Sequence, residues 1–378
     1  MYDVAIIGAG ISGLYCGLHI PNHIIFESER VGGRIHTHYD PYYEISAGRF
    51  NHSHKILWSL IKKYNLKTHK IPRGLIYKEI TNNKIKDIPA ERFISNCIDY
   101  ILHHKHSNLS NTQLHLHLHL RNITFYKHCI NLIGKENTDL LVSTYGYYSE
   151  FKVMNAYDAL RLFNTSHIYY VLDGGMSTLC KEMEKGLNIK MEKVTSVEIT
   201  SIEKTSIEKY AQVFKVNNVY AKKVIFTIPT SQLHFPILKQ FYSEINSVVP
   251  MKICRIYIGF EKPWLQRTTT NSFLRHMIPF GNIVMISYTD GQDVLPFLSN
   301  GKIKPKKEIK KMVIDELHKL YTDVPKVNYF ECYYWPAGTH TWPTHVNSDE
   351  ISEKMIHPMP NLYICGDGLS HTQGWMEH

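Results

Sequence analysis

The sequence has no hydrophobic run long enough to cross a membrane, and none of its seven cysteines stands in a C-x-x-C pair. The cysteines are odd in number and scattered, which excludes a disulfide framework, disfavours a zinc site and indicates reduced thiols in a reducing compartment. An apolar strand is expected from Val4, which leaves no room for a signal peptide. We therefore expect a cytoplasmic protein with no membrane partner.

Acidic residues are in the minority, with 34 Asp and Glu against 43 Lys and Arg, giving a net charge of +9. The lysines are spread along the chain, and the densest run, Lys302 to Lys311, is typical of one solvated face leading into a helix. We therefore expect no nucleic-acid partner. The apolar fraction of 43% predicts a globular protein, and 378 residues are enough for two lobes with a large core.

The opening residues, MYDVAIIGAGISG, predict a nucleotide-binding turn. Val4 to Ile7 form an apolar strand, and a G-x-G-x-x-G turn then opens a helix whose N-terminus favours a phosphate. The cofactor-binding residues expected here are Gly8, Gly10, Ser12 and Gly13. A second strand ends at Glu27, where an acid favours a ribose 2′-hydroxyl and hence FAD or NAD over NADP. The alternative is an ordinary strand ending in a solvated glutamate.

The next segment, SERVGGRIHTHYD, resembles the E-x-x-R-x-G-G-R signature of the flavin-containing amine oxidases. The matching residues are Glu27, Arg30, Gly32, Gly33 and Arg34. In that family the arginines approach the FAD phosphates, for which a planar guanidinium suits bidentate pairing. The alternative is a Gly-Gly turn with two surface arginines.

Further family patterns recur in order. LDGGMSTLCKEM is similar to the turn that opens a helix, MEKVTSVEI to a strand whose Val194 contacts adenine, and KKVIFTIP to a strand of the FAD sheet. NLYICGDGLSHTQGWMEH places Gly366 and Asp367 on the pyrophosphate and ribityl chain, and Trp375 and Met376 in the G-[WY]-[MV]-E turn beside the flavin ring. The family continues from this turn into a long helix, so this chain is expected to hold only a stump of that helix or to be shortened.

The resemblance implies an α/β fold with two domains. A discontinuous, Rossmann-like FAD-binding domain is expected at 1–70, 168–235 and 335–378, and an α+β substrate-binding domain at 71–167 and 236–334. Periodicity predicts a helix over His54 to Tyr64, followed by a helical lid to about Asn164. Strands are predicted over Cys254 to Trp264 and over Ile283 to Thr289.

The implied activity is FAD-dependent amine oxidation. A hydride passes from the carbon bearing the amine to flavin N5, and the imine product hydrolyses. The sequence has no second G-x-G-x-x-G for a nicotinamide donor, so O2 is the expected oxidant, giving H2O2. No cysteine stands at the family's flavin-linking position near His340, so the FAD is expected to be noncovalent.

The catalytic residues implied are Arg255, Trp375 and His340. Arg255 occupies the slot of the family's lysine near N5 if one residue is missing downstream; without that gap Cys254 aligns instead. Trp375 and His340 match the two walls of an aromatic cage, with Trp335 nearby, although His340 and Trp335 also fit simple core packing. Because arginine does not deprotonate, the alternative function is a catalytically impaired FAD-binding protein with a structural or regulatory role.

The stretch SAGRF bears on the substrate. Ala47 and Gly48 match the turn beneath the flavin, and Arg49 matches an arginine that clamps the substrate carboxylate in L-amino-acid oxidases. The substrate is expected to be a small amine or L-amino acid. The alternative is that Arg49 pairs with a lid carboxylate or the flavin.

The stretch LHLHLHL suggests a metal site. His115, His117 and His119 would share one face of a strand, but no carboxylate or cysteine completes a ligand set. We expect no metal.

Overall fold

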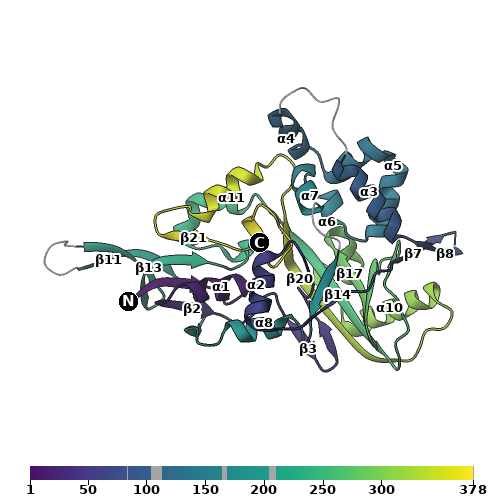
Figure 1. The fold of residues 1–378 in the computed structure, drawn as a ribbon, viewed down its shortest axis with the longest axis horizontal. Helices are drawn as coiled ribbons and strands as arrows, with labels where there is room; N and C mark the ends of the chain where they lie inside the picture. The colour runs from purple at the N-terminus through teal and green to yellow at the C-terminus, as the bar shows by residue number, and fades with distance from the viewer. Residues whose placement is uncertain (83, 104–112, 164–167, 204–209, 378) are drawn as a thin grey trace.

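The computed structural model describes the chain apart from residues 83, 104–112, 164–167, 204–209 and 378. Two seven-stranded sheets organise it, with a group of helices above the second sheet in the view of Figure 1. The predicted α/β fold is confirmed.

The first sheet holds the opening strand at its centre. Its strands, in order across the sheet, are β10 (Ile189–Met191), β2 (His23–Glu27), β1 (Tyr2–Ile7), β13 (Val219–Phe226), β12 (Tyr210–Val216) and β11 (Val197–Glu203), with β21 (Leu362–Ile364) also paired to β13. The strands β10, β2, β1, β13 and β21 run parallel. Parallel strands are covered on both faces, which explains why β1 and β2 are continuous apolar runs. Helix α1 (Ile11–His19) follows β1 directly.

The second sheet carries the later strands and a hairpin from the first third of the chain. Its order is β20 (Val327–Thr341), β14 (Val249–Phe260), β17 (Ile283–Asp290), β16 (His276–Phe280), β15 (Thr268–Thr270), β7 (Ile76–Thr81) and β8 (Lys84–Pro89). Helix α10 (Lys306–Leu320) packs Ile309 and Val313 into the buried core of this sheet. Elsewhere on the sheet Tyr257 stacks on Tyr43, their ring centroids 4.2 Å apart. Tyr43 belongs to the hairpin of β3 (Thr37–Tyr39) and β4 (Tyr42–Glu44).

The lid is helical, as predicted, but it begins after the β7–β8 hairpin, which sequence periodicity missed. Its helices are α3 (Glu91–His103), α4 (Gln113–Arg121), α5 (Phe125–Tyr145), α6 (Ser149–Lys152) and α7 (Ala156–Phe163). The predicted end of the lid at Asn164 lies outside the described residues.

The stretch LHLHLHL lies within the predicted helical lid and forms helix α4, which packs against α7, so the strand that would put its histidines on one face is not formed. Leu and His tolerate a helix, so tertiary packing overrides their alternation. In a helix His117 and His119 point in different directions, and the side chain of His115 lies outside the described part. Within the described residues no group of three His, Cys, Asp or Glu side chains is placed to hold a metal ion.

Other local predictions can be compared directly with the structure. The predicted helix over 54–64 is α2 (Lys55–Lys63), and the Gly-Gly-Met turn opens α8 (Met176–Met183). The strand predicted around Val194 is wrong, because residues 192–196 connect β10 to β11. There the side chain of Asn217 accepts a hydrogen bond from the Thr195 amide at 2.9 Å, which holds an irregular turn.

The boundary predicted at residue 335 falls inside a continuous element. Strand β20 stays paired with β14 as far as Thr341, opposite Val249. Trp342 and Val248, the next residues along the two strands, lie in the core of the first sheet. The two sheets are therefore linked by a hydrogen-bonded pair of strands.

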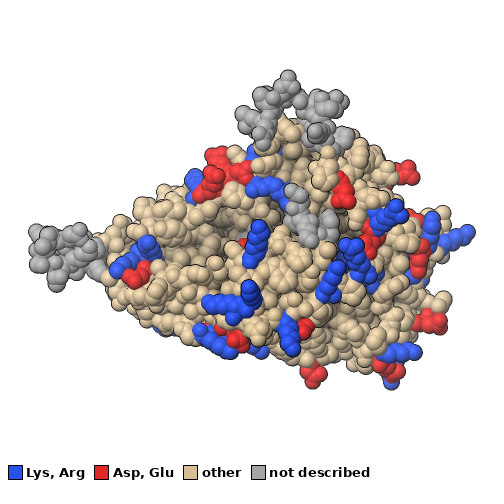
Figure 2. Space-filling model, in the orientation of Figure 1, with Lys and Arg blue, Asp and Glu red and all other residues tan. Residues whose placement is uncertain are grey.

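The described helices include none that is both long enough and apolar enough to cross a membrane. On the face shown in Figure 2, Lys and Arg side chains are spread over several elements and alternate with Asp and Glu.

Candidate functional site

In the first glycine loop, Gly8 and Gly13 are tightly packed, whereas Gly10 borders empty space. Gly8 has φ +109°, and a Cβ on Gly13 would lie 1.9 Å from the Gly8 carbonyl oxygen, so both positions require glycine. A Cβ on Gly10, by contrast, would meet no atom within 4 Å. Gly10 stands at the N-terminus of α1 and Ser12 in its first turn. Free space therefore borders backbone N–H groups at a helix start, where an anion is favoured.

A second glycine loop lies against the first. The Gly32 amide donates to the Ala9 carbonyl at 2.8 Å, and a Cβ on Gly33 would lie 3.1 Å from the Gly10 Cα. Arg30 holds this loop from inside by donating to the carbonyls of Val31 and Ile35, both at 3.0 Å. Arg30 thus stabilises the loop through hydrogen bonds to its backbone. It is not a surface arginine without structural contacts, which was the alternative interpretation.

Glu27, the last residue of β2, faces the same loops. Its Oε2 accepts from the Ala9 amide at 2.8 Å, and its Oε1 accepts from the Glu29 and Arg30 amides at 2.9 and 3.2 Å. An ionised carboxylate offers about four acceptor positions, so room remains for one further donor such as a hydroxyl.

Arg34 and Asp367 form a two-pronged ion pair. Arg34 Nη1 lies 3.1 Å from Asp367 Oδ2, and Nη2 contacts Oδ1 more closely. Asp367 begins the 3-10 turn η4 (Asp367–Leu369) after Gly366, whose φ is +125°. Burial alone would raise the pKa of Asp367, but the Arg34 guanidinium holds it well below its usual range. The pair joins the second glycine loop to the last loops of the chain.

His340 lies beside this ion pair, at the end of β20. Its Nδ1 is 3.9 Å from Asp367 Oδ2, beyond hydrogen-bond reach, and a Cβ on Gly368 would approach its ring at 3.4 Å. The ring is 1% exposed, and neither ring nitrogen has a hydrogen-bond partner. His340 is therefore a buried polar group left open to a ligand donor or acceptor, next to the loop predicted for the ribityl chain.

Six side chains form a continuous series of contacts that we call the arginine–aromatic row. In order, they are Trp375, Tyr169, Arg49, Tyr147, Tyr288 and Arg255. Trp375 stacks on Tyr169 with ring centroids 5.9 Å apart and planes at 19°. The Arg49 guanidinium lies 5.2 Å from the Tyr169 centroid, and its Nη2 donates to the Tyr147 hydroxyl at 3.0 Å.

The row continues to the second sheet. The rings of Tyr147 and Tyr288 lie 4.9 Å apart, and the Arg255 guanidinium lies 4.4 Å from the Tyr288 centroid. All members except Tyr147 keep part of their surface exposed. The row therefore borders accessible space between the C-terminal turn and β14.

The row carries uncompensated positive charge. Arg49 makes no ion pair with any acidic side chain among the described residues. The nearby Glu150 is a weakened counter-charge, because burial and then Asp290 raise its pKa and favour its neutral form. Burial and the charges of Arg267 and Arg49 lower the pKa of His276 well below its ordinary value. The lid carboxylate that could have paired with Arg49 does not do so.

Arg255 braces the turn that precedes Arg49. Its Nη1 donates to the Ile45 carbonyl at 3.1 Å and to the Ser46 carbonyl. In the same turn Gly48 has no room for a side chain, because a Cβ would lie 2.4 Å from Glu44 Cγ. Ala47 is held between these two fixed points. The neighbouring Cys254 is fully buried in the core beneath α10, so Arg255 is the residue that faces the site.

The other predicted residues pack into cores. Trp335 stacks on Tyr333, with centroids 6.1 Å apart, in the cluster around Tyr257. Val194 is 8% exposed in the core of the first sheet. Met376 packs against the core that holds Ala9 and Leu14, so the C-terminal turn and the first glycine loop share one cluster.

Sequence reasoning missed Tyr147, Tyr169 and Tyr288. They come from the lid, from β9 (Tyr169–Leu172) and from β17, and no motif or spacing connects them. The only signal was a general abundance of tyrosine, with 25 in the chain.

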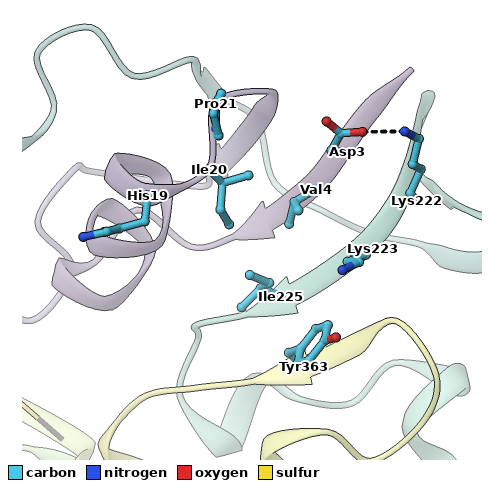
Figure 3. Close-up of a pocket in the computed structure, with 9 residues that line it drawn as sticks. All are labelled: Asp3, Val4, His19, Ile20, Pro21, Lys222, Lys223, Ile225 and Tyr363. Atoms are coloured by element: carbon cyan, nitrogen blue, oxygen red, sulfur yellow. Dashed lines mark ion pairs between the residues drawn. The ribbon is translucent and has the colours of Figure 1, made fainter.

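A cavity of about 500 Å³ lies near the start of β1, away from the glycine loop that follows the end of this strand (Figure 3). It lies between the last turn of α1 and the strands β13 and β21, and Ile20, Ile225 and Tyr363 contribute to its lining. The ion pair of Asp3 and Lys222, 2.7 Å long, stands at its margin. Because β1 enters here and the glycine loop follows its other end, this cavity is separate from the site above.

Residues 11–378 match the family model described as flavin containing amine oxidoreductase. No curated protein sequence matches the chain. Among solved structures, a triple mutant of putrescine oxidase with redesigned cofactor binding superimposes with a TM-score of 0.75 at 15% identity. The match covers 100% of this chain and 95% of that one. At this identity the likeness supports the fold.

Proposed function

Because this chain belongs to the flavin-containing amine oxidoreductases, we propose that it oxidises an amine carrying a carboxylate, of which an L-amino acid is the simplest, with noncovalent FAD and O2. The observation that carries the substrate class is Arg49, a guanidinium among aromatic rings with no acidic partner in the described chain. A fork of N–H donors suits a carboxylate, whereas its charge repels a bare diamine.

The residues at the glycine loops fit a dinucleotide cofactor. Gly10 borders open space at the start of α1, and Glu27 keeps room for one hydroxyl donor. The nitrogens of His340 and the Nε1 of Trp375 are buried without partners, as expected of groups that a bound ring system would contact. The first glycine loop with Glu27 would hold the diphosphate and ribose, and the loops at Asp367 and Trp375 would hold the flavin end.

Bound flavin supplies the two-electron oxidation of the carbon that bears the amine, and the imine released from it hydrolyses in water. The protein's own task is positioning. Arg49 binds the substrate carboxylate, and the Tyr147 hydroxyl fixes the orientation of its guanidinium. Aromatic rings around Arg49 exclude water from this charge, which strengthens its attraction for an anion.

The amine must lose its ammonium proton before oxidation. Surrounding cations lower the pKa of a bound ammonium, since like charges disfavour the charged form. Arg49, Arg255 and Arg267 supply this field. Burial first, and then the charges of Arg267 and Arg49, lower the pKa of His276 in the same region.

The test compares each L-amino acid with the amine that lacks only its carboxylate, such as phenylalanine with phenethylamine. Purified protein is mixed with each under anaerobic conditions while bleaching of the flavin absorbance is followed. We expect faster bleaching with the amino acid, and Arg49→Gln to abolish that advantage while leaving the amine rate similar. Arg92→Gln, on an exposed position of α3, is the matched control. Equal losses for both substrates in Arg49→Gln would refute the clamp.

One observation favours a second candidate function, a flavin-binding protein with impaired turnover. Arg255 is the residue that we match to the family's lysine if one residue is missing downstream, and its Nη1 donates to two backbone carbonyls. A guanidinium keeps its proton in a protein and therefore does not act as an acid or base. Flavin that stays oxidised with every amine and amino acid tested would support this candidate against the first.

A further inference from the structure

Six of the seven cysteines lie in three neighbouring pairs, and one pair differs from the others. Cys16 and Cys365 are 349 residues apart in the sequence, yet their sulfurs lie 3.9 Å apart. The second pair, Cys254 and Cys332, joins adjacent strands, and the third, Cys97 and Cys129, lies within the lid. Each of these two pairs includes a fully buried thiol, whereas Cys16 and Cys365 are both partly exposed.

The partly exposed pair lies close in sequence to two residues that line the cavity. Cys16 precedes Ile20 by one turn of α1, and Cys365 follows Tyr363 by two positions at the end of β21. Side chains four apart on a helix and two apart on an extended chain share a face. The faces of α1 and β21 that line the cavity therefore also carry the two thiols. Both thiols are partly exposed, so a molecule as small as a peroxide can contact them.

The two thiols are chemically unequal. Their contact lowers the pKa of Cys16, because an S–H of the neighbouring thiol can donate to a thiolate at this distance. Cys16 is therefore the one that more readily becomes a thiolate, the reactive form.

We propose that Cys16 and Cys365 are a redox-active thiol pair that hydrogen peroxide converts to a disulfide. The Cys16 thiolate attacks one peroxide oxygen, the O–O bond breaks, and the hydroxide released takes up a proton to become water. The Cys365 sulfur then attacks the resulting sulfenic acid, the S–O bond breaks, and a second water leaves with the Cys365 proton. Two thiols are oxidised by two electrons in total, and one peroxide is reduced to two waters.

Closing the bond requires the sulfurs to move from 3.9 Å to about 2.05 Å. The backbone next to Cys365 leaves space for this, because Gly366 has no atom within 4 Å of its Cβ position. The disulfide would tie α1, which starts at the first glycine loop, to the segment that leads into Asp367. It would also close a very long loop of chain, which restricts the unfolded state and stabilises the folded one.

The test treats the full-length protein, with the cofactor it carries on purification, with hydrogen peroxide. Free thiols are then alkylated, and peptides are mapped without reduction. We expect the loss of two of the seven thiols, a cross-linked peptide joining Cys16 to Cys365, and complete reversal by dithiothreitol. The unmodified sequence suffices for this map, so the result does not depend on the folding of any variant. Added peroxide also makes it independent of amine turnover and of the proposed substrate.

Three variants sharpen the test. Cys16→Ser and Cys365→Ser should each lose the cross-link, whereas Cys332→Ser, which removes a partly exposed thiol from another pair, should keep it. The oxidised wild type should melt a few degrees higher than the reduced form, and Cys16→Ser should show no such shift. The proposal is overturned if Cys16 becomes sulfinic acid while Cys365 remains a free thiol, or if another pair cross-links first.

Discussion

Arg34 and Asp367, 333 residues apart in the sequence, contact each other through both guanidinium nitrogens and both carboxylate oxygens. The side chain of Asp367 is 10% exposed, so removal of its partner would leave a mostly buried charge. The pair therefore fixes the last loops of the chain against the second glycine loop.

Replacing Arg34 tests this role. We expect Arg34→Ala to lower the free energy of unfolding by roughly 2–3 kcal/mol, between the values typical of exposed and of buried pairs. The double variant Arg34→Ala with Asp367→Asn should be less destabilised than Arg34→Ala alone, because it removes the unpaired charge. Urea unfolding of the two variants measures the difference, and simple additivity of the two substitutions would contradict it.

Alanine at two glycines of the first loop should separate folding from cofactor binding. In Gly13→Ala the new Cβ would lie 1.9 Å from a backbone oxygen, so we expect a loss of stability of at least about 1–3 kcal/mol. Gly10→Ala has room for its Cβ and an ordinary φ of −69°, so its apoprotein should melt close to the wild type. Its methyl group enters the space proposed for the diphosphate. Gly10→Ala with unchanged flavin affinity in a titration would place the cofactor elsewhere.

Glu44 should make stability depend on pH. Burial raises its pKa from 4.5 to about 7, although the Met176 amide and the Thr37 hydroxyl donate to it. The folded state thus holds this proton more tightly than the unfolded chain, so stability declines as pH rises from about 4.5 to 7. The effect amounts to at most about 3.5 kcal/mol, at roughly 1.4 kcal/mol per pKa unit.

Glu44→Gln should remove that decline, because an amide does not ionise. The melting temperature of the variant relative to wild type should increase between pH 5 and pH 8. Glu353→Gln, at an exposed position of α11 (Ser348–Ile356), serves as control and should track the wild type across this range. A pH-independent difference between Glu44→Gln and wild type would show that Glu44 does not titrate there.

Arg255→Lys should lower the stability of the protein and increase the rate at which O2 reoxidises the reduced flavin. Lysine cannot reproduce the hydrogen bonds of Arg255 to the Ile45 and Ser46 carbonyls, so we expect a loss of about 1 kcal/mol in stability. An ammonium can exchange its proton with water, so reoxidation of the reduced flavin by O2 should become faster. Stopped-flow mixing of the reduced protein with O2 measures this rate. Arg255→Met controls for the lost charge, and equal rates in Lys and Met would contradict the proton-exchange argument.

Local signals in the sequence predicted the glycine loop and the strands to which we assign nucleotide binding. Gly8, Gly13 and Glu27 lie within the first thirty residues. Backbone sterics at the two glycines and the length of the strands determine the local structure there. The helix from Lys55 to Lys63 followed from its own periodicity. In each case the residues that determine the structure are close together in the sequence.

The parts that escaped prediction depend on packing between distant segments. Tyr147, Tyr169 and Tyr288 approach one another only because the lid, β9 and β17 meet around Arg49. The position of His340 beside the Arg34–Asp367 pair likewise arises from the path of β20. Tertiary context also turned LHLHLHL into a helix.

The continuous pairing of β14 with β20 limits how the two halves of the molecule can move. Val249 pairs with Thr341 where the chain passes between the sheets, and the residues just beyond are held in the first core. A hinge at this point would have to break a ladder of backbone hydrogen bonds, which makes wide opening costly. We therefore expect substrate and product to reach and leave the arginine–aromatic row through small movements of the lid helices, while the two sheets keep their relative position.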